Sequence, residues 1–294
     1  MKFKVAMSFA GSGADINDNG LVVGYVGNTT AAQKAFVAVG ESITVLPISA
    51  YNSQALAIGP DNEVVGTATT PDRYGVFGWK HENNQLTVIP GLGGTVVMPR
   101  DTNGSVIVGQ ASLASRAGRA FRHENGKTED LGTLGGPASV AQAVNASGSV
   151  AGQSRINTSS MIMRPFLYKD GAMSSFGAPG SGSAWCYGLN DNNVGVGQDG
   201  GSAVMFRGNE TIVLSGGQGS AFAINNEGFA VGQVGNPGTA MLWANGQTIN
   251  LNDATSDLGG VSLMSAKSIN NHNQIVAVGF KGSMLTTVVL EPVA

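Results

Sequence analysis

The sequence predicts an all-β fold, specifically a seven-bladed β-propeller built from four-stranded blades. The pattern apolar-Asn-x-x-Gly-x-apolar-apolar-Gly returns seven times in 294 residues, an average spacing of about 42 residues, which is typical of propeller blades. Glycine makes up 44 residues and recurs at fixed places, which indicates tight turns. Asn-Gly pairs between short apolar runs indicate β-hairpins. The closing glycines of the pattern are Gly24, Gly66, Gly109, Gly152, Gly197, Gly232 and Gly279.

Residues 95–136 show the strands of one repeat in order. A first strand leads into the turn at 102–104, and the β-branched run 105–110 follows as the second strand. Residues 119–122 form the third strand, an Asn-Gly turn follows it, and residues 128–131 form the fourth. The same order fits the whole chain as a single domain over residues 1–294. The predicted blades, called units 1 to 7 below, span 10–49, 50–94, 95–136, 137–178, 179–216, 217–252 and 253–294, the last completed by residues 1–9.

The two ends of the chain are expected to pair with each other. Unit 7 has only three strands, the last at residues 285–290, whereas an additional strand-like segment at residues 2–8 precedes unit 1. The simplest account is that residues 2–8 form the missing outer strand of unit 7. Such pairing would close the ring and leave no open sheet between its first and last blades.

The loops indicate which face of the propeller carries function. The first-to-second and third-to-fourth turns share one face and are short and uniform. The other loops share the opposite face and vary in length, and variable loops on a rigid scaffold are where recognition usually occurs. We therefore predict a ligand- or partner-binding surface on this variable face, centred on units 2 to 4, since arginine and aromatic side chains dominate binding surfaces. Its residues are Arg73, Tyr74, Arg116, Arg119, Arg155 and Trp185. A solvated loop surface without specific function remains the alternative.

No metal site and no cofactor are expected. One segment opens like a calcium-binding loop, but Val26 occupies the position where that loop needs its last carboxylate. His81, His123 and His272 are expected to be exposed and too widely spread around the ring to bind one metal ion. Cys186 lies in a strand pattern and is expected to be a buried structural cysteine.

No catalytic residues are expected either. No Ser/His/Asp set stands out, and the glycine-rich segments are not followed by a helix, as a phosphate-binding loop would be. The sequence therefore predicts a protein that is not an enzyme. A carbohydrate-active propeller remains an alternative, because carboxylates on the variable face could pair across the channel mouth for glycoside hydrolysis. These carboxylates are Asp72, Asp199, Asp253 and Asp257.

Composition limits the partners of the chain. Only 12% of residues are charged, the net charge is −3 and no basic block occurs, which argues against nucleic-acid binding. No apolar run reaches 18 residues, so membrane insertion is not expected. The N-terminal segment lacks the apolar stretch of a secretory signal.

Three runs of the repeat, at residues 119–123, 130–136 and 224–228, read Arg-Ala-Phe-Arg-His, Asp-Leu-Gly-Thr-Leu-Gly-Gly and Ile-Asn-Asn-Glu-Gly. The repeat, most closely in these runs, resembles the HAF family of bacterial extracellular repeats. The resemblance covers essentially the whole chain and implies a repeat architecture, with no catalytic residues to carry over. The low content of charged residues and the high content of glycine are typical of proteins exposed outside the cell, yet no export signal is found. This combination favours a phage virion component, of tail or fibre, that contacts other virion proteins or a host-surface glycan or receptor. An extracellular or periplasmic bacterial binding module is the alternative.

Overall fold

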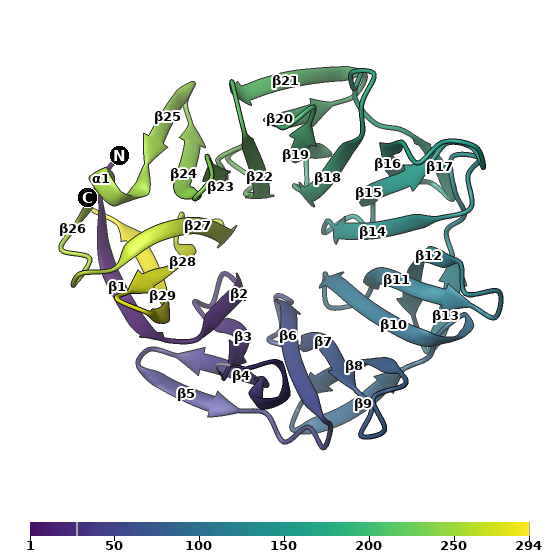
Figure 1. Cartoon of the computed structure of the whole chain (residues 1–294), viewed down its shortest axis with the longest axis horizontal. Coiled ribbons are helices and arrows are strands. Elements are labelled where there is room, and N and C mark those ends of the chain that lie inside the picture. The colour runs from purple at the N-terminus through teal and green to yellow at the C-terminus, as the bar shows by residue number, and fades with distance from the viewer. Residues whose placement is uncertain (28, 294) are drawn as a thin grey trace.

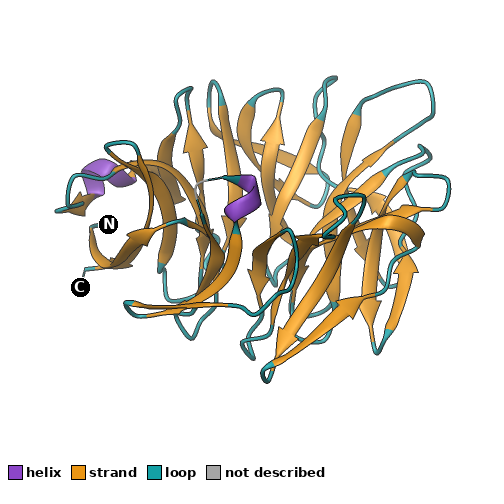
Figure 2. Cartoon of the chain, turned by 60° about the horizontal axis from the view of Figure 1, so that its bottom comes forward, coloured by secondary structure: helices purple, strands orange, loops and turns teal. Residues whose placement is uncertain are grey.

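The computed structural model describes residues 1–27 and 29–293; residues 28 and 294 lie outside the described residues. The chain forms a ring of β-sheets around a central opening, with the first strand of each predicted unit innermost (Figure 1). These innermost strands are β2 (Ser12–Ile16), β6 (Asn52–Ile58), β10 (Gly93–Thr102), β14 (Ser139–Val144), β18 (Ala184–Leu189), β22 (Gly219–Ile224) and β27 (Ser262–Ile269). Figure 2 shows the strands crossing the thickness of the ring and the loops gathered at its two faces. Helix is confined to η1 (Thr30–Ala32) and α1 (Leu251–Ala254) in the described part of the chain, where no helix has the length and apolar character needed to cross a bilayer.

The prediction of an all-β chain is confirmed, and four of the described sheets contain four antiparallel strands each. They correspond to units 1, 4, 5 and 6. Their strands are β2 (Ser12–Ile16), β3 (Val22–Val26), β4 (Lys34–Val39) and β5 (Ser42–Val45); β14 (Ser139–Val144), β15 (Val150–Arg155), β16 (Met163–Lys169) and β17 (Ala172–Ser175); β18 (Ala184–Leu189), β19 (Val194–Asp199), β20 (Ser202–Arg207) and β21 (Glu210–Ser215); and β22 (Gly219–Ile224), β23 (Ala230–Val234), β24 (Thr239–Ala244) and β25 (Gln247–Asn250).

Units 2 and 3 are joined into one eight-stranded sheet, which the sequence does not predict. The link is a short parallel pairing of β8 with β10, in which Val76 lies opposite Val96. At ten residues β10 is long enough for its first half to reach the start of β8 while its second half pairs with β11. The strands are β6 (Asn52–Ile58), β7 (Val64–Thr69), β8 (Val76–Glu82), β9 (Gln85–Ile89), β10 (Gly93–Thr102), β11 (Ile107–Leu113), β12 (Gly118–Glu124) and β13 (Lys127–Asp130).

The predicted pairing of the two chain ends is confirmed. β1 (Phe3–Ala10) runs antiparallel to β29 (Met284–Pro292) as the outer neighbour of that strand. The inner strands of this sheet are β27 (Ser262–Ile269) and β28 (Ile275–Lys281), and the two-residue β26 (Thr255–Ser256) adds a fifth, parallel strand beyond β1. Because Phe3 is only 1% exposed, β1 contributes to the core as well as to the sheet.

The hydrophobic core lies between neighbouring sheets. Within the described residues it divides into seven clusters, each formed by two successive units, and one of them joins unit 7 to unit 1 through residues such as Met7, Ile16 and Val276. Burial of apolar side chains stabilises a fold by about 25 cal/mol per Å². Every unit therefore depends on both of its neighbours for its core.

A β-bulge interrupts the innermost strand of every unit at one equivalent place. In β6, for example, Ala55 lies opposite Gly66 and Ala57 lies opposite Val65, so that Leu56 is the extra residue. A bulge bends a strand and changes the direction of the extra side chain. The bulged residues are Ala14, Leu56, Arg100, Gln142, Tyr187, Phe222 and Lys267.

Six of the closing glycines lie opposite these bulges, on the second strand of their unit, and Gly279 lies opposite Leu263, beside an additional bulge at Met264. A Cβ atom on Gly66 would overlap the carbonyl oxygen of Gln54, and a Cβ atom on each of the other six closing glycines would overlap a carbonyl oxygen of its own first strand. Only glycine permits so close an approach of two backbones. The strongest feature of the sequence repeat thus has a steric cause.

Candidate functional site

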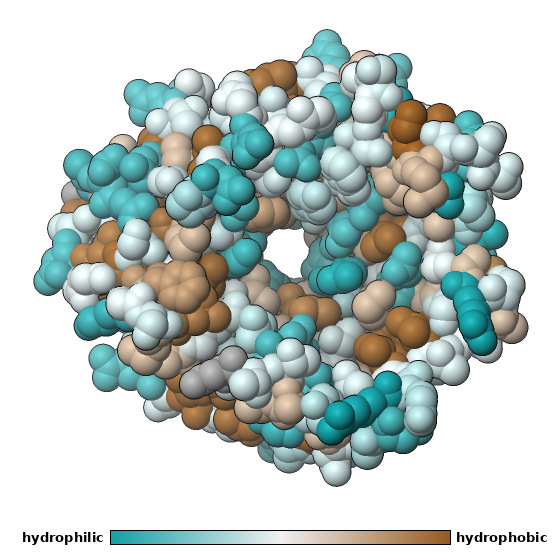
Figure 3. Space-filling model, in the orientation of Figure 1, coloured by the Kyte–Doolittle hydropathy of each residue, from teal (hydrophilic) through white to brown (hydrophobic). Residues whose placement is uncertain are grey.

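A cavity of about 370 Å³ occupies the centre of the ring. The space-filling view shows the opening, surrounded by a mixture of hydrophilic and hydrophobic residues (Figure 3). The lining comes from the last residues of the innermost strands and from the first-to-second turns, on the face opposite the predicted variable face. Ligand cavities commonly have volumes of about 300–1,000 Å³, so the cavity is large enough for a small molecule.

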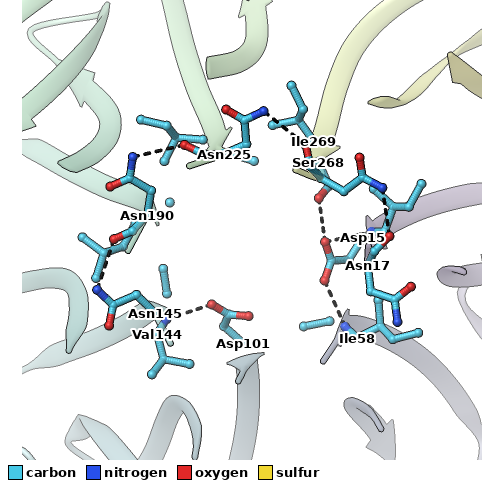
Figure 4. A pocket seen from close by; sticks show the side chains of 18 of the residues that line it. Asp15, Asn17, Ile58, Asp101, Val144, Asn145, Asn190, Asn225, Ser268 and Ile269 are labelled. Carbon is cyan, nitrogen blue, oxygen red and sulfur yellow. Dashed lines mark hydrogen bonds between the residues drawn. The ribbon is translucent and has the colours of Figure 1, made fainter. Parts of the chain in front are cut away.

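A belt of asparagine side chains surrounds the mouth of the cavity (Figure 4). Each of these residues directly follows an innermost strand, and its Nδ2 donates to a backbone carbonyl oxygen in the next unit. Asn145 donates to Asn190, Asn190 to Asn225 and Asn225 to Asn270, over 3.1–3.2 Å. Asn103, Asn17 and Asn270 donate in the same way to Asn145, Gly59 and Asn17 respectively.

The same asparagines also fold the turns that follow them. The Oδ1 atom of Asn225 accepts hydrogen bonds from the backbone N–H groups of Glu227 and Phe229. Asx side chains commonly stabilise turns in this way. In every unit except unit 2, one asparagine therefore fixes its own turn and links it to the next unit, which explains the regular spacing of the Asn-x-x-Gly pattern within this chain.

In every unit except unit 3, the fourth residue of the turn adopts a left-handed backbone, which explains why it is glycine or asparagine. Asn62, Asn193 and Asn273 have φ angles of 68°, 55° and 61°. The Oδ1 atom of each accepts a hydrogen bond from the belt asparagine of the preceding unit, as in the 2.7 Å contact from Asn17 to Asn62. Asparagine tolerates this backbone conformation better than most residues and here adds a second bond between units.

The belt is interrupted at unit 2, where glycine replaces the asparagine. A side chain on Gly59 would overlap the carboxyl group of Glu63, which is fully buried. Glu63 in turn accepts a 2.9 Å hydrogen bond from the hydroxyl group of Thr102 in unit 3. Burial raises the pKa of the Glu63 carboxyl, in spite of this hydrogen bond. A different polar contact thus joins units 2 and 3.

The seven bulged residues line the wall of the cavity below the belt. Two are aromatic, and the rings of Tyr187 and Phe222 lie 5.8 Å apart with an angle of 49° between their planes. Lys267 follows on the next unit, with its Nζ 5.2 Å from the centroid of the Phe222 ring, a cation–π contact. Units 5 to 7 therefore present a continuous aromatic and cationic wall.

Two carboxyl groups also face the cavity and connect neighbouring units. Asp15 accepts a hydrogen bond from the N–H group of Ile58 over 2.9 Å, and Asp101 accepts one from Val144 over 2.8 Å. Asp15 also accepts a 2.6 Å hydrogen bond from the hydroxyl group of Ser268. Burial is the main cause that raises the pKa of both carboxyl groups, and with the charge of Asp15 it raises the pKa of Asp101 to about 8. Asp101 is therefore largely neutral at pH 7.

Two cations of the wall have no ion pair or side-chain hydrogen bond among the described residues. They are Arg100, exposed to the channel, and Lys267, which is half-buried. Desolvation by the surrounding protein lowers the pKa of both side chains. Partial burial of a charge without a partner is unfavourable, so a bound anion would offset this cost.

The predicted site residues lie away from this cavity. Arg73 and Arg116 occupy loops with left-handed backbone, and the guanidinium carbon of Arg73 lies 4.1 Å from the centroid of the Tyr51 ring. Tyr74 is 88% exposed beside Arg73. These residues lie in the β7–β8 and β11–β12 loops, as expected for the variable face.

The remaining predicted residues make local contacts. Arg119 forms a 3.8 Å ion pair with Asp130, and Arg155 donates two hydrogen bonds to the carbonyl oxygen of Ser160. Trp185 is half-buried in β18. Across the described residues, none of the six predicted residues lines the central cavity, and no hydrogen bond, ion pair or cation–π contact joins two of them. Arg73 and Tyr74 are adjacent because they follow one another in the sequence, and the cation–π contact of Arg73 is with Tyr51.

Two of the three histidines differ from their predicted exposure. His81 and His123 are half-buried, because they lie within β8 and β12 and pair with neighbouring strands, rather than in turns. Cys186 is fully buried as predicted, and burial raises the pKa of its thiol. Among the residues that the structure describes, no three His, Cys, Asp or Glu side chains come close enough to bind one metal ion.

The four candidate carboxylates of the carbohydrate-active alternative do not meet in the central cavity. Asp72 accepts hydrogen bonds from Thr70 and Tyr74 within its own loop, which lower its pKa, and Asp199 accepts one from Gly180. Asp253 and Asp257 likewise bond within their own segment. Each of these four carboxylates thus accepts one or more hydrogen bonds that stabilise the local chain conformation.

Comparison with known proteins shows the fold. The chain is similar to TolB from Acinetobacter baumannii (12% identity, TM-score 0.53), covering 92% of this chain and 63% of that one. It is also similar to the β-propeller domain of the trilobed protease from Pyrococcus furiosus (9%, TM-score 0.61, covering 97% and 94%). A third match is an acylaminoacyl peptidase in complex with a chloromethyl ketone (9%, TM-score 0.60, covering 96% and 51%). The chain thus spans about two thirds of TolB and about half of the peptidase.

No protein-family model matches the chain, and no curated protein matches it in sequence, so the resemblance to HAF repeats stays a prediction. The prediction that the chain is not an enzyme is corrected by the structural matches. Propellers of this shape form parts of the trilobed protease and of the acylaminoacyl peptidase, so the fold is found in enzymes and gives no ground for excluding one. At 9% identity these matches establish the β-propeller fold alone.

Sequence reasoning missed the cavity wall. The signal was present, because the residue three positions before each belt asparagine is the one that varies from alanine to arginine and phenylalanine. Where the residue type varies inside an otherwise regular repeat, core packing does not determine it. In this ring the varying side chains line the central channel.

Proposed function

We propose that the chain is a seven-bladed β-propeller that binds a small ligand in its central cavity. The observation that carries this proposal is the pair of cations, Arg100 and Lys267, that line a cavity of about 370 Å³ without an ionic partner in the described chain. The asparagine belt supports it, because side chains held by hydrogen bonds on rigid strands form a preorganised site and lose little conformational freedom on binding.

Filling the cavity tests this proposal. Ala14 is the smallest bulged residue of the wall, and Ala14→Trp would occupy the channel. Ala172→Trp, at an exposed position on β17, is the matched control. A panel of sugars, organic acids and nucleotides is screened by thermal shift, since a ligand that binds the folded state raises its stability with concentration. Shifts present in the control and absent from Ala14→Trp support the cavity, whereas equal shifts in both variants exclude it as the site.

A second candidate function is partner binding by the variable face. The observation that favours it is the exposure of two large apolar side chains on loops of this face, Tyr74 at 88% and Met161 at 76%. Cation–π contact with Tyr51 holds Arg73 beside Tyr74, and arginine with tyrosine is a common binding pair. In this proposal the chain contacts other virion proteins, or a host-surface glycan or receptor.

Localisation separates this second candidate from the alternatives. Mass spectrometry of purified virus particles is expected to find the chain at a fixed copy number if it is a virion component. Detection only in cells or in secreted medium would instead favour an extracellular or periplasmic bacterial binding module. Tyr74→Ala is expected to weaken partner binding at least about tenfold, as loss of a binding hot spot does. Val213→Ala, at a 61% exposed apolar position of β21 outside the variable loops, is the control.

A further inference from the structure

The backbone of the cavity wall presents hydrogen-bond donors at one level of the channel. The N–H groups of Ile58 and Val144 donate to the carboxyl groups of Asp15 and Asp101 in the preceding units. Ile58 lies opposite Val64 and Val144 opposite Val150, directly before the turn. In this register the N–H group of the innermost strand points away from the second strand and into the channel.

Five other residues share that register. Ile16 and Thr102 donate to Asp15 and Asp101 of their own units, and the other three lie in units 5 to 7. Leu189 lies opposite Gly195, Ile224 opposite Ala230 and Ile269 opposite Ile275, each directly before its turn. Their N–H groups therefore point into the channel at the same level.

The preceding units offer no carboxyl group to these three donors. The positions equivalent to Asp15 and Asp101 are Ala143, Gly188 and Ala223 in units 4, 5 and 6. Alanine and glycine have no side-chain oxygen atom that could accept a hydrogen bond. One half of the ring thus supplies its own carboxyl groups, and the other half presents the matching donors without them.

The side chains of the same units match an anion with an apolar part. Lys267 supplies a positive charge at the cavity wall, and Tyr187 and Phe222 form an adjoining aromatic surface. Arg100 adds a second cation from unit 3. Asp18 and Asp191 lie at the rim and are engaged in the belt. Asp18 accepts two hydrogen bonds from Asn271, and Asp191 accepts one from Ala146 and one from Asn226, in the turns on either side of it.

We propose that the sector of the cavity formed by units 5 to 7 binds a small organic carboxylate. Its carboxylate group accepts hydrogen bonds from the N–H groups of Ile224 and Ile269 and pairs with Lys267, while its ring or hydrocarbon part packs on Tyr187 and Phe222. The ligand thereby supplies the group that Asp15 and Asp101 supply in the other half of the ring. This inference rests on the proposed function, since it names the ligand class of the same cavity.

The first experiment uses benzoate, which combines a carboxylate with an aromatic ring, and follows backbone amide signals by NMR. Titration is expected to shift the amide signals of Ile224 and Ile269 with a saturable profile. Lys267→Met is expected to weaken binding about tenfold or more, because a charged hydrogen bond contributes about 1.5–3 kcal/mol. Lys281→Met removes an exposed lysine of β28 and is expected to leave binding unchanged.

A second variant tests the position of the ligand. Ala223→Asp places a carboxyl group where Asp15 has its own, before the N–H group of Ile269, and is expected to abolish benzoate binding. Retained Tm would show that the variant folds. Unchanged benzoate affinity in Ala223→Asp would overturn the placement.

Two neutral or inorganic probes separate this inference from the proposed function. Benzyl alcohol has the ring without the carboxylate, and inorganic phosphate has the charge without the ring. If benzyl alcohol binds in the cavity as tightly as benzoate, the carboxylate inference is wrong but the cavity remains a ligand site. If phosphate binds as tightly as benzoate, the aromatic part of the inference is wrong. If no compound of the panel moves the cavity amides, both proposals fail.

Discussion

The side chain of Asn270 donates a 2.9 Å hydrogen bond to the carbonyl oxygen of Asn17, 253 residues earlier in the chain. This bond joins unit 7 to unit 1 at the mouth of the cavity. The Oδ1 atom of Asn270 also accepts from the N–H groups of His272 and Gln274. The buried side-chain amide of Asn270 therefore stabilises its own turn and also links unit 7 to unit 1.

Substitution of Asn270 tests the energetic importance of the belt. Asn270→Ala is expected to lower the free energy of unfolding by about 1–3 kcal/mol, because it leaves buried donors and acceptors without partners. Asn270→Asp keeps the acceptor and loses only the donated bonds. Asn192→Ala is the control. Asn192 is exposed in the equivalent turn of unit 5, and among the described residues its side chain makes no hydrogen bond to another unit. Its loss is expected to change stability by less than about 0.5 kcal/mol. Urea denaturation measures all three, and equal losses at Asn270 and Asn192 would refute the structural importance of the belt.

The interruption at Gly59 predicts a coupled pair of substitutions. Gly59→Asn alone is expected to destabilise the fold by about 1–3 kcal/mol, because the new side chain overlaps Glu63. Combined with Glu63→Ser, which copies the arrangement of Asn145 and Ser149 in unit 4, the asparagine can donate to unit 3 as its equivalents do. The double variant is expected to recover most of the loss. A double-mutant cycle with no coupling would contradict this explanation.

The outer strand β1 is expected to be essential for stability. Phe3→Ala should lower the free energy of unfolding by about 3–5 kcal/mol, since the ring is almost fully buried. Phe280→Ala, at a phenylalanine that is 41% exposed, is the matched control and should have a much smaller effect. Deletion of residues 1–9 should destabilise the whole domain. An unchanged melting temperature after this deletion would show that β1 is dispensable.

The raised pKa of Asp101 predicts that stability falls as pH rises. Its carboxyl group has a pKa of about 8 in the folded protein and a usual value of 3.8, so the folded state binds more protons than the unfolded state between about pH 4 and pH 8. Across this window Tm should decrease with increasing pH. Asp101→Asn cannot ionise and should flatten the profile. Some slope should remain, because the pKa of Asp15 is raised as well. A wild-type Tm that rises from pH 5 to pH 8 in parallel with that of the variant would contradict the assignment.

The buried thiol of Cys186 offers a probe of ring opening. Burial raises its pKa and removes it from solvent, so it should be unreactive towards a thiol reagent in the folded protein. The rate of modification should increase with urea in parallel with unfolding. Modification in native buffer as fast as that of a free cysteine would mean that units 4 and 5, between which Cys186 packs, separate readily.

The sequence predicted the parts of the fold that repeat, and failed where the repeat changes. Glycine at the closing position is required by steric overlap in every unit, and asparagine at the turn by hydrogen bonds that every unit except unit 2 shares, so their spacing revealed the architecture. The residue type at the bulged position differs from unit to unit, as in Ala14, Arg100 and Phe222. A bulge also interrupts the alternation of apolar and polar residues from which strands are predicted. The cavity at the face of the short turns was missed for this reason, since loop length had directed attention to the opposite face.

The force needed to open the ring is set by the weakest contact between two neighbouring units, because separation of these two units exposes the strands on both sides of the break. The belt is missing between units 2 and 3, where Gly59 stands. These are also the two units that β8 and β10 join into one sheet and that Glu63 and Thr102 bridge over 2.9 Å. Mechanical pulling on the chain should therefore open another junction first, and units 2 and 3 should detach together as the last intact fragment.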